Sequence, residues 1–90
     1  MKIQLLVTPD CVPCAKAETF WRQISEKQGL SLSVLDTRGG EGKQVARRLR
    51  LKTFPALLIN GALVAVGVQS PEDAATLLRA TDSQRGTHGS

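Results

Sequence analysis

Two cysteines, Cys11 and Cys14, lie close together in the stretch TPDCVPC, which covers residues 8–14. Thiols at this spacing can bind a metal ion, close a structural disulfide or carry electrons by thiol–disulfide exchange. In such exchange the attacking species is the thiolate. The elements that surround the two sulfur atoms therefore decide which of these uses the chain favours.

The pair falls at the junction of a predicted strand and a predicted helix. Residues 3–7, IQLLV, are a short apolar run that stops before Pro9, which is typical of a buried strand. Helical spacing follows at four apolar positions, Ala17, Phe20, Trp21 and Ile24, and Gly29 is the expected stop of this helix. The first N–H groups of a helix lack partners within the helix, and the helix dipole is positive there. A thiolate at Cys11 would be stabilised by both effects.

This placement predicts separate roles for the two thiols. Cys11, at the mouth of the helix, is expected to attack a substrate disulfide as the nucleophile. Cys14, nearly one turn into the helix, is expected to resolve the mixed disulfide, and its proximity favours this step. Pro13 suits the first helical turn, because its missing N–H would have no partner there.

A metal-binding module that uses the same two thiols is the alternative function. A closed zinc site needs four ligands, whereas the chain has two cysteines and one histidine, His88. A single chain cannot complete such a site, although two chains could share one, and two-coordinate copper is a further form of this alternative. A structural disulfide would close too short a loop to stabilise much. An interaction module with incidental thiols also stays open. We predict no bound cofactor and no metal, and a redox-active disulfide between Cys11 and Cys14.

Between residues 30 and 51 the chain repeats the pattern of a strand followed by a helix. Leucine and valine alternate with serine over residues 30–34, which predicts a strand with one buried face. A helix is expected from about residue 41 to residue 51. The first strand, the first helix and the second strand then form a βαβ unit, whose strands are parallel.

A hairpin and a last helix complete the pattern. Two apolar runs, residues 56–59 and 62–66, flank Asn60-Gly61, the dipeptide most typical of a two-residue hairpin turn. Ser70 is the expected cap of a helix over residues 70–80. The order β-α-β-α-β-β-α predicts an α/β fold with a four-stranded mixed sheet and helices on both faces.

The length of 90 residues predicts one domain, residues 1–80, with a disordered polar tail at residues 81–90. The apolar runs are too short to span a membrane and no secretory signal is visible, so we expect a cytoplasmic monomer. Residues 43–52 hold five cations and no acid, a pattern typical of a nucleic-acid surface or of a solvated helix face. Because the chain has only three Phe and Trp residues for stacking on bases, we expect no nucleic-acid partner.

These features together resemble the thioredoxin superfamily, over residues 1 to about 80. The resemblance is carried by CVPC after a strand, by Thr53-Phe54-Pro55, by the Asn60-Gly61 hairpin and by the closing Gly67. It implies a thioredoxin-like fold of glutaredoxin size and a dithiol–disulfide oxidoreductase that takes part in electron transport and cell redox homeostasis. It also implies a cis peptide bond before Pro55. The substrate-binding residues that it implies are Val12, Pro13, Phe54, Pro55, Val66 and Gly67.

The same resemblance implies the partners. The substrate would be a disulfide-bearing protein or a small thiol compound, and the electron donor would be a reductase or glutathione. Ser70, Glu72 and Asp73 fall near the position that contacts glutathione in glutaredoxins. A helix cap followed by first-turn acids is sufficient to explain these three residues, and it is the favoured interpretation.

The chain also departs from thioredoxins in three ways. It begins directly at the redox strand, as glutaredoxins do, and Asp10 replaces the usual tryptophan before the first cysteine. Leu5 stands where thioredoxins carry a buried aspartate that relays a proton to the second cysteine. That relay is therefore absent, or it is provided by Glu18, Lys16 or water.

Overall fold

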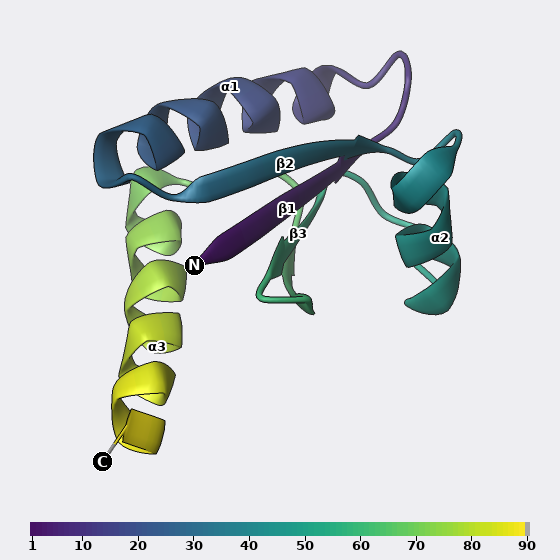
Figure 1. Cartoon of the computed structure of the whole chain (residues 1–90). Coiled ribbons are helices and arrows are strands. Elements are labelled where there is room, and N and C mark those ends of the chain that lie inside the picture. Colours follow the sequence, from purple (N-terminus) through teal and green to yellow (C-terminus); the bar gives the residue numbers. More distant parts are fainter. Residues whose placement is uncertain (90) are drawn as a thin grey trace.

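The computed structural model describes the backbone of residues 1–89 and the side chains of residues 1–81. Its elements follow the order predicted from the sequence (Figure 1). They are β1 (Lys2–Val7), α1 (Val12–Gln28), β2 (Ser31–Asp36), α2 (Gly40–Arg48), β3 (Ala56–Ile59), β4 (Ala62–Val66) and α3 (Pro71–Gly89). None of the described helices is both long and apolar enough to cross a membrane.

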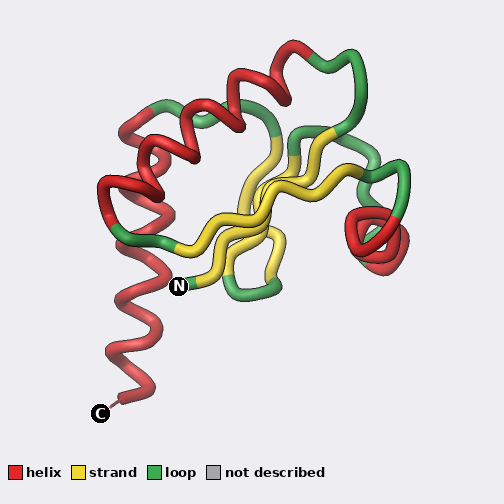
Figure 2. The backbone as a smooth tube through the Cα atoms, turned by 45° about the horizontal axis from the view of Figure 1, so that its top comes forward, coloured by secondary structure: helices red, strands yellow, loops and turns green. Residues whose placement is uncertain are grey.

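The strands form one mixed sheet in the order β2-β1-β3-β4 (Figure 2). β1 and β2 are parallel, whereas β3 is antiparallel to both β1 and β4. The pairing joins Val7 to Asp36, Leu6 to Ala56, and Ala56 to Val66. The ends of β1, β2 and β4 and the start of β3 therefore meet at one edge of the sheet. This edge positions the two cysteines, which follow β1 directly.

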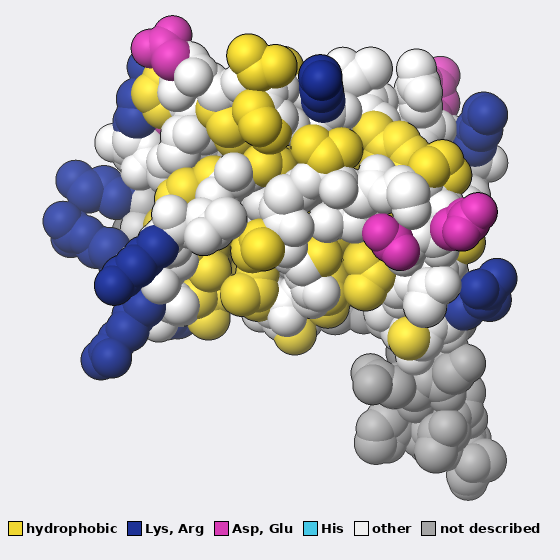
Figure 3. All heavy atoms as spheres, turned by 180° about the vertical axis from the view of Figure 1, so that it is seen from behind, with side chains coloured by type: hydrophobic (Ala, Val, Ile, Leu, Met, Phe, Trp, Pro, Cys, Tyr) yellow, Lys and Arg dark blue, Asp and Glu magenta, His cyan; other side chains and the backbone are white. Residues whose placement is uncertain are grey.

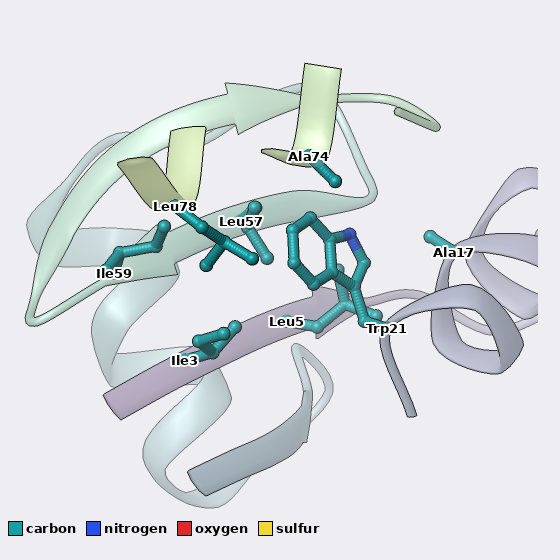
Figure 4. Packing of buried hydrophobic residues seen from close by; sticks show 8 residues of the cluster. All are labelled: Ile3, Leu5, Ala17, Trp21, Leu57, Ile59, Ala74 and Leu78. Atoms are coloured by element: carbon teal, nitrogen blue, oxygen red, sulfur yellow. The ribbon is translucent and has the colours of Figure 1, made fainter. Parts of the chain in front are cut away.

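Helices cover both faces of the sheet, as predicted. On one face, Trp21 of α1 is fully buried among side chains of β1, β3 and α3 (Figure 4). Its cluster consists of Ile3, Leu5, Ala17, Trp21, Leu57, Ile59, Ala74 and Leu78. On the other face, Val45 of α2 packs with Leu6, Ala56 and Leu58. Successive residues of a strand point to opposite faces, which is why Leu5 and Leu6 belong to different clusters.

Three of the predicted local signals have the expected geometry. Gly29 ends α1 in the left-handed conformation, with φ of 66°. Asn60 and Gly61 both have positive φ values, 51° and 86°, as a two-residue hairpin turn of the primed type requires. The Ser70 hydroxyl accepts a hydrogen bond of 3.1 Å from the Asp73 N–H, and this contact confirms Ser70 as the cap of α3.

α2 ends earlier than predicted, because the chain turns sharply after Arg48. Arg50 has a left-handed backbone, with φ of 53°. The Arg50 N–H donates to the carbonyl of Arg47 at 3.2 Å, and the Leu51 N–H donates to that of Ala46 at 2.9 Å. These two bonds form a Schellman motif, which usually has glycine at its left-handed position. The sequence carries arginine there, so the stop was not visible in it.

α3 continues to Gly89, beyond the end predicted at residue 80. The disordered tail over residues 81–90 stays a prediction. After Pro71 the chain has no proline to stop the helix, and each residue added to a formed helix gains one hydrogen bond. Ser90 lies outside the described residues, and the division of the chain at residue 80 stays a prediction.

Candidate active site

The two cysteines lie at the start of α1 and form a disulfide, with their Cα atoms 5.2 Å apart. Cys11 is the N-cap residue, and its sulfur accepts a hydrogen bond of 3.2 Å from the Cys14 N–H. This is the contact between a helix N–H and the outer sulfur that the sequence predicted. Cys11 is half-buried, whereas Cys14 is only 3% exposed. An incoming disulfide can therefore reach Cys11 before it reaches Cys14.

Thr8 lies beside the inner sulfur and was missed in the sequence analysis. Its hydroxyl oxygen is 3.9 Å from Cys14 Sγ, within hydrogen-bond distance for sulfur. Glu18, one of the groups considered for the proton relay, accepts a bond of 2.9 Å from Arg22 instead. Leu5 is fully buried in the core. Thr8 precedes Pro9 at the end of the strand, and the only signal for its role was its position six residues before Cys14.

The other predicted site residues follow or precede strands at the same edge of the sheet. The Phe54–Pro55 peptide bond, just before β3, is cis. The Gly67 N–H, just after β4, donates a 2.7 Å hydrogen bond to the Pro55 carbonyl and so joins these two segments. Val12 and Val66 are 68% and 48% exposed. Apolar side chains are thus offered to solvent around the disulfide.

Exposure differs among the remaining residues of this predicted surface. Pro13 is exposed at the start of α1, Phe54 is half-buried, and Pro55 is buried. A substrate can therefore touch the Pro13 ring, whereas at Pro55 the side chain faces the core.

Charged groups also lie at this edge. Asp10 is exposed and has a left-handed backbone, with φ of 53°. Asp36, at the end of β2, is paired with Arg38 at 2.8 Å. The hydrogen bonds from the Arg38 side chain and backbone hold the pKa of the Asp36 carboxyl below its usual value. The Asp36 carboxylate thereby compensates most of the positive charge of Arg38.

No group of three or more potential metal ligands occurs among the residues that the structure describes. The side chain of His88 lies outside those residues. Within the described part of the chain, the two cysteines thus have no third ligand beside them. Their disulfide, in contrast, needs no further group.

Comparison with known proteins places these features in context. A family model described as a thioredoxin domain matches residues 1–79. A probable thioredoxin of Archaeoglobus fulgidus is 27% identical over 77 residues, which cover 86% of this chain and 85% of that protein.

Solved structures of thioredoxins share the fold. Thioredoxin 1 of Thermosipho africanus superposes with a TM-score of 0.65 at 13% identity and covers 100% of both chains. Thioredoxin f2 of Chlamydomonas reinhardtii has a TM-score of 0.67 at 17% identity, over 88% of this chain and 77% of that one. A complex of ferredoxin:thioredoxin reductase with thioredoxin f2 also contains a similar chain, with a TM-score of 0.59 and 23% identity over 93% of this chain and 76% of that one.

Proposed function

This chain belongs to the thioredoxin domain family, whose members are in general dithiol–disulfide oxidoreductases, and we propose that Cys11-Val12-Pro13-Cys14 is its redox centre. The proposed reaction is the reduction of disulfide bonds in other proteins or in small-molecule disulfides. The observation that carries the proposal is the Cys11–Cys14 disulfide at the N-terminus of α1, with one sulfur accessible and the other nearly buried.

In the proposed reaction the reduced protein starts with a thiolate at Cys11. This thiolate attacks one sulfur of the substrate disulfide, a mixed disulfide forms, and the other substrate sulfur leaves as a thiolate. Cys14 then loses its proton and attacks Cys11 Sγ, which releases the second substrate thiolate. The substrate disulfide has gained two electrons and takes up two protons, and the protein holds the disulfide that is seen in the structure.

The surface around the disulfide supports a peptide substrate. Val12, Pro13 and Val66 offer apolar contact area. We expect the backbone of Phe54 to hydrogen-bond an extended chain, and Gly67 to support this segment through its bond to the Pro55 carbonyl. We assign these residues, together with Pro55, to substrate binding.

The electrons would come from a reductase or from glutathione. Support for a reductase comes from a relative, the thioredoxin f2 that forms a complex with ferredoxin:thioredoxin reductase. A glutathione-binding role for Ser70, Glu72 and Asp73 has weaker support, because the Ser70 hydroxyl is used as the cap of α3. The proposal includes a cytoplasmic location, where thiols are held mostly reduced, and action as a monomer, because one chain supplies both thiols.

A turnover assay with two electron supplies tests the proposal. The substrates are a disulfide-bonded protein and bis(2-hydroxyethyl) disulfide, and the supplies are thioredoxin reductase with NADPH and glutathione with its reductase. We expect turnover with at least one supply and a loss of at least about a hundredfold in Cys11→Ser, because the remaining thiol is buried. The proposal is wrong if the wild type shows no turnover, or if it carries near-stoichiometric zinc or copper that is lost in Cys11→Ser.

Replacing Thr8 by valine is expected to slow only the second step. The hydroxyl can donate a hydrogen bond to the thiolate that develops on Cys14, across the contact of 3.9 Å. At about 1 kcal/mol for such a bond, resolution of the mixed disulfide should slow about fivefold. Thr8→Ser, which keeps the hydroxyl, is the control. Rapid quenching with an alkylating reagent measures this step in a single turnover, and an unchanged rate in Thr8→Val would remove Thr8 from the mechanism.

A further inference from the structure

The net charge of the chain comes from one short segment. Residues 43–52 contain five of its twelve cations and none of its eight acids. The remaining seven cations and eight acids sum to −1, so this segment accounts for the whole net charge of +4. Its five cations, Lys43, Arg47, Arg48, Arg50 and Lys52, are all exposed.

Four of these cations line a surface groove of about 360 Å³ beside α2. They are Lys43, Arg47, Arg50 and Lys52. Thr37, in the loop between β2 and α2, also lines the groove. The two ion pairs found among the described side chains, Glu18–Arg22 and Asp36–Arg38, involve none of the four. Viewed from behind, Lys and Arg side chains gather at the end of the molecule where α2 lies (Figure 3). The groove is therefore a cationic surface without acids of its own to match it.

This cationic groove lies at the same edge of the sheet as the disulfide. The Thr37 N–H donates to the Val7 carbonyl at 3.0 Å, so that the groove borders the end of the strand that leads to Cys11. On its other side, Lys52 is three residues from Pro55, at most about 11 Å along the chain. Figure 1 shows α2 and the start of α1 at the same end of the sheet. A protein bound over the disulfide would thus extend over the groove.

Arg50 occupies a backbone conformation that lowers the stability of the fold when the residue is not glycine. Arg50 holds the left-handed position of the Schellman motif, where glycine has no steric penalty. The left-handed conformation costs more free energy for arginine than for glycine, but arginine adds a positive charge to the groove.

We propose that the cationic groove binds carboxylate-rich segments of the partner protein whose disulfide Cys11 attacks. The inference rests on the proposed function. It specifies in addition that the preferred protein substrate is negatively charged. A nucleic acid would offer anions too, but it would find few rings to stack on. Trp21 is fully buried, Phe20 packs edge-on against it at 5.5 Å between ring centres, and Phe54 is half-buried. Cations beside a reactive sulfur also raise the encounter rate with an acidic substrate.

The proposal is tested with three synthetic peptides that contain the same internal disulfide. The disulfide loop is flanked by three glutamates in the first peptide, by three serines in the second and by three lysines in the third. The test variant is Arg47→Gln/Arg50→Gly/Lys52→Gln, in which glycine removes the charge and relieves the left-handed backbone. The control variant, Lys2→Gln/Lys27→Gln/Arg79→Gln, loses the same charge from exposed positions away from this edge. Reduction is measured as kcat/KM at low salt and in 1 M salt. Binding is measured with alkylated peptides, which have no disulfide, and with a single-stranded oligonucleotide.

For the wild type at low salt we expect the acidic peptide to react about tenfold faster than the neutral one. This preference should disappear in the test variant, persist in the control variant, and vanish in 1 M salt, where the Debye length is about 3 Å. The melting temperature of Arg50→Gly alone should not fall below that of the wild type. Equal rates with all three peptides, or an oligonucleotide bound more tightly than the acidic peptide, would overturn the inference alone. If no peptide is reduced, the proposed function fails, and the alkylated peptides still decide whether the groove selects carboxylates.

Discussion

Replacing Cys14 by serine is expected to leave the protein covalently attached to its substrate through Cys11. The first attack needs only the outer sulfur, which is half-buried at the mouth of α1. The second needs the inner sulfur, which α1 holds within bonding reach. Serine cannot displace a thiolate from a disulfide under these conditions, because its hydroxyl stays protonated. Incubation of reduced Cys14→Ser with a disulfide-bonded protein should therefore accumulate the mixed disulfide, and intact mass before and after dithiothreitol measures it.

The matched control is Cys11→Ser, which keeps a single thiol at the other position. Because Cys14 is only 3% exposed, this variant should form little or no adduct under the same conditions. Equal amounts of adduct in the two variants would contradict the assignment of an outer nucleophile and an inner resolving thiol. Adduct in Cys11→Ser alone would reverse the two roles.

Local signals in the sequence predicted most of the fold. The Asn60-Gly61 turn, the Ser70 cap and the Gly29 stop each depend on residues within one turn of the chain, and all three are present in the structure. The position of Cys11 and Cys14 after a strand and at a helix start is also a local property. This is why the order of elements and the placement of the two cysteines could be predicted without knowledge of the sheet.

The features that were missed depend on contacts between distant segments, or on a residue in an unusual backbone conformation. Thr8 meets Cys14 only once the turn through Asp10 has formed, and Thr37 lies beside the cations of the groove only once α2 has packed against β2. The end of α2 could not be predicted, because arginine and not glycine occupies the left-handed position at Arg50. Residue spacing predicts the faces of single elements, whereas these features depend on how the chain turns between elements and on how the elements pack together.

The packing of α2 against β2 depends on one further contact that the sequence did not reveal. Gly42, in the first turns of α2, is buried. A Cβ atom at this position would collide with the backbone carbonyl of Asp36, the last residue of β2. Backbone cannot rotate away as a side chain can, so a larger residue must displace the helix or the strand end. This contact fixes the distance of the cation-bearing helix from the strand that borders the candidate active site.

Gly42→Ala is therefore expected to lower the stability, although alanine is the better helix former. The gain in helix propensity is about 1 kcal/mol, whereas forcing extra atoms into a packed contact costs about 1–3 kcal/mol, and a collision with backbone lies at the upper end. We expect a net loss of about 2 kcal/mol in the free energy of unfolding, which corresponds to a melting temperature lower by about 10 °C. Gly39→Ala is the matched control, because Gly39 is extended, with φ of −169°, and has open space around its Cβ position. Denaturant unfolding of both variants measures the difference in stability. If Gly42→Ala is as stable as Gly39→Ala, α2 does not approach β2 as closely as the structure indicates. The cationic groove beside α2 would then not be held in a fixed position.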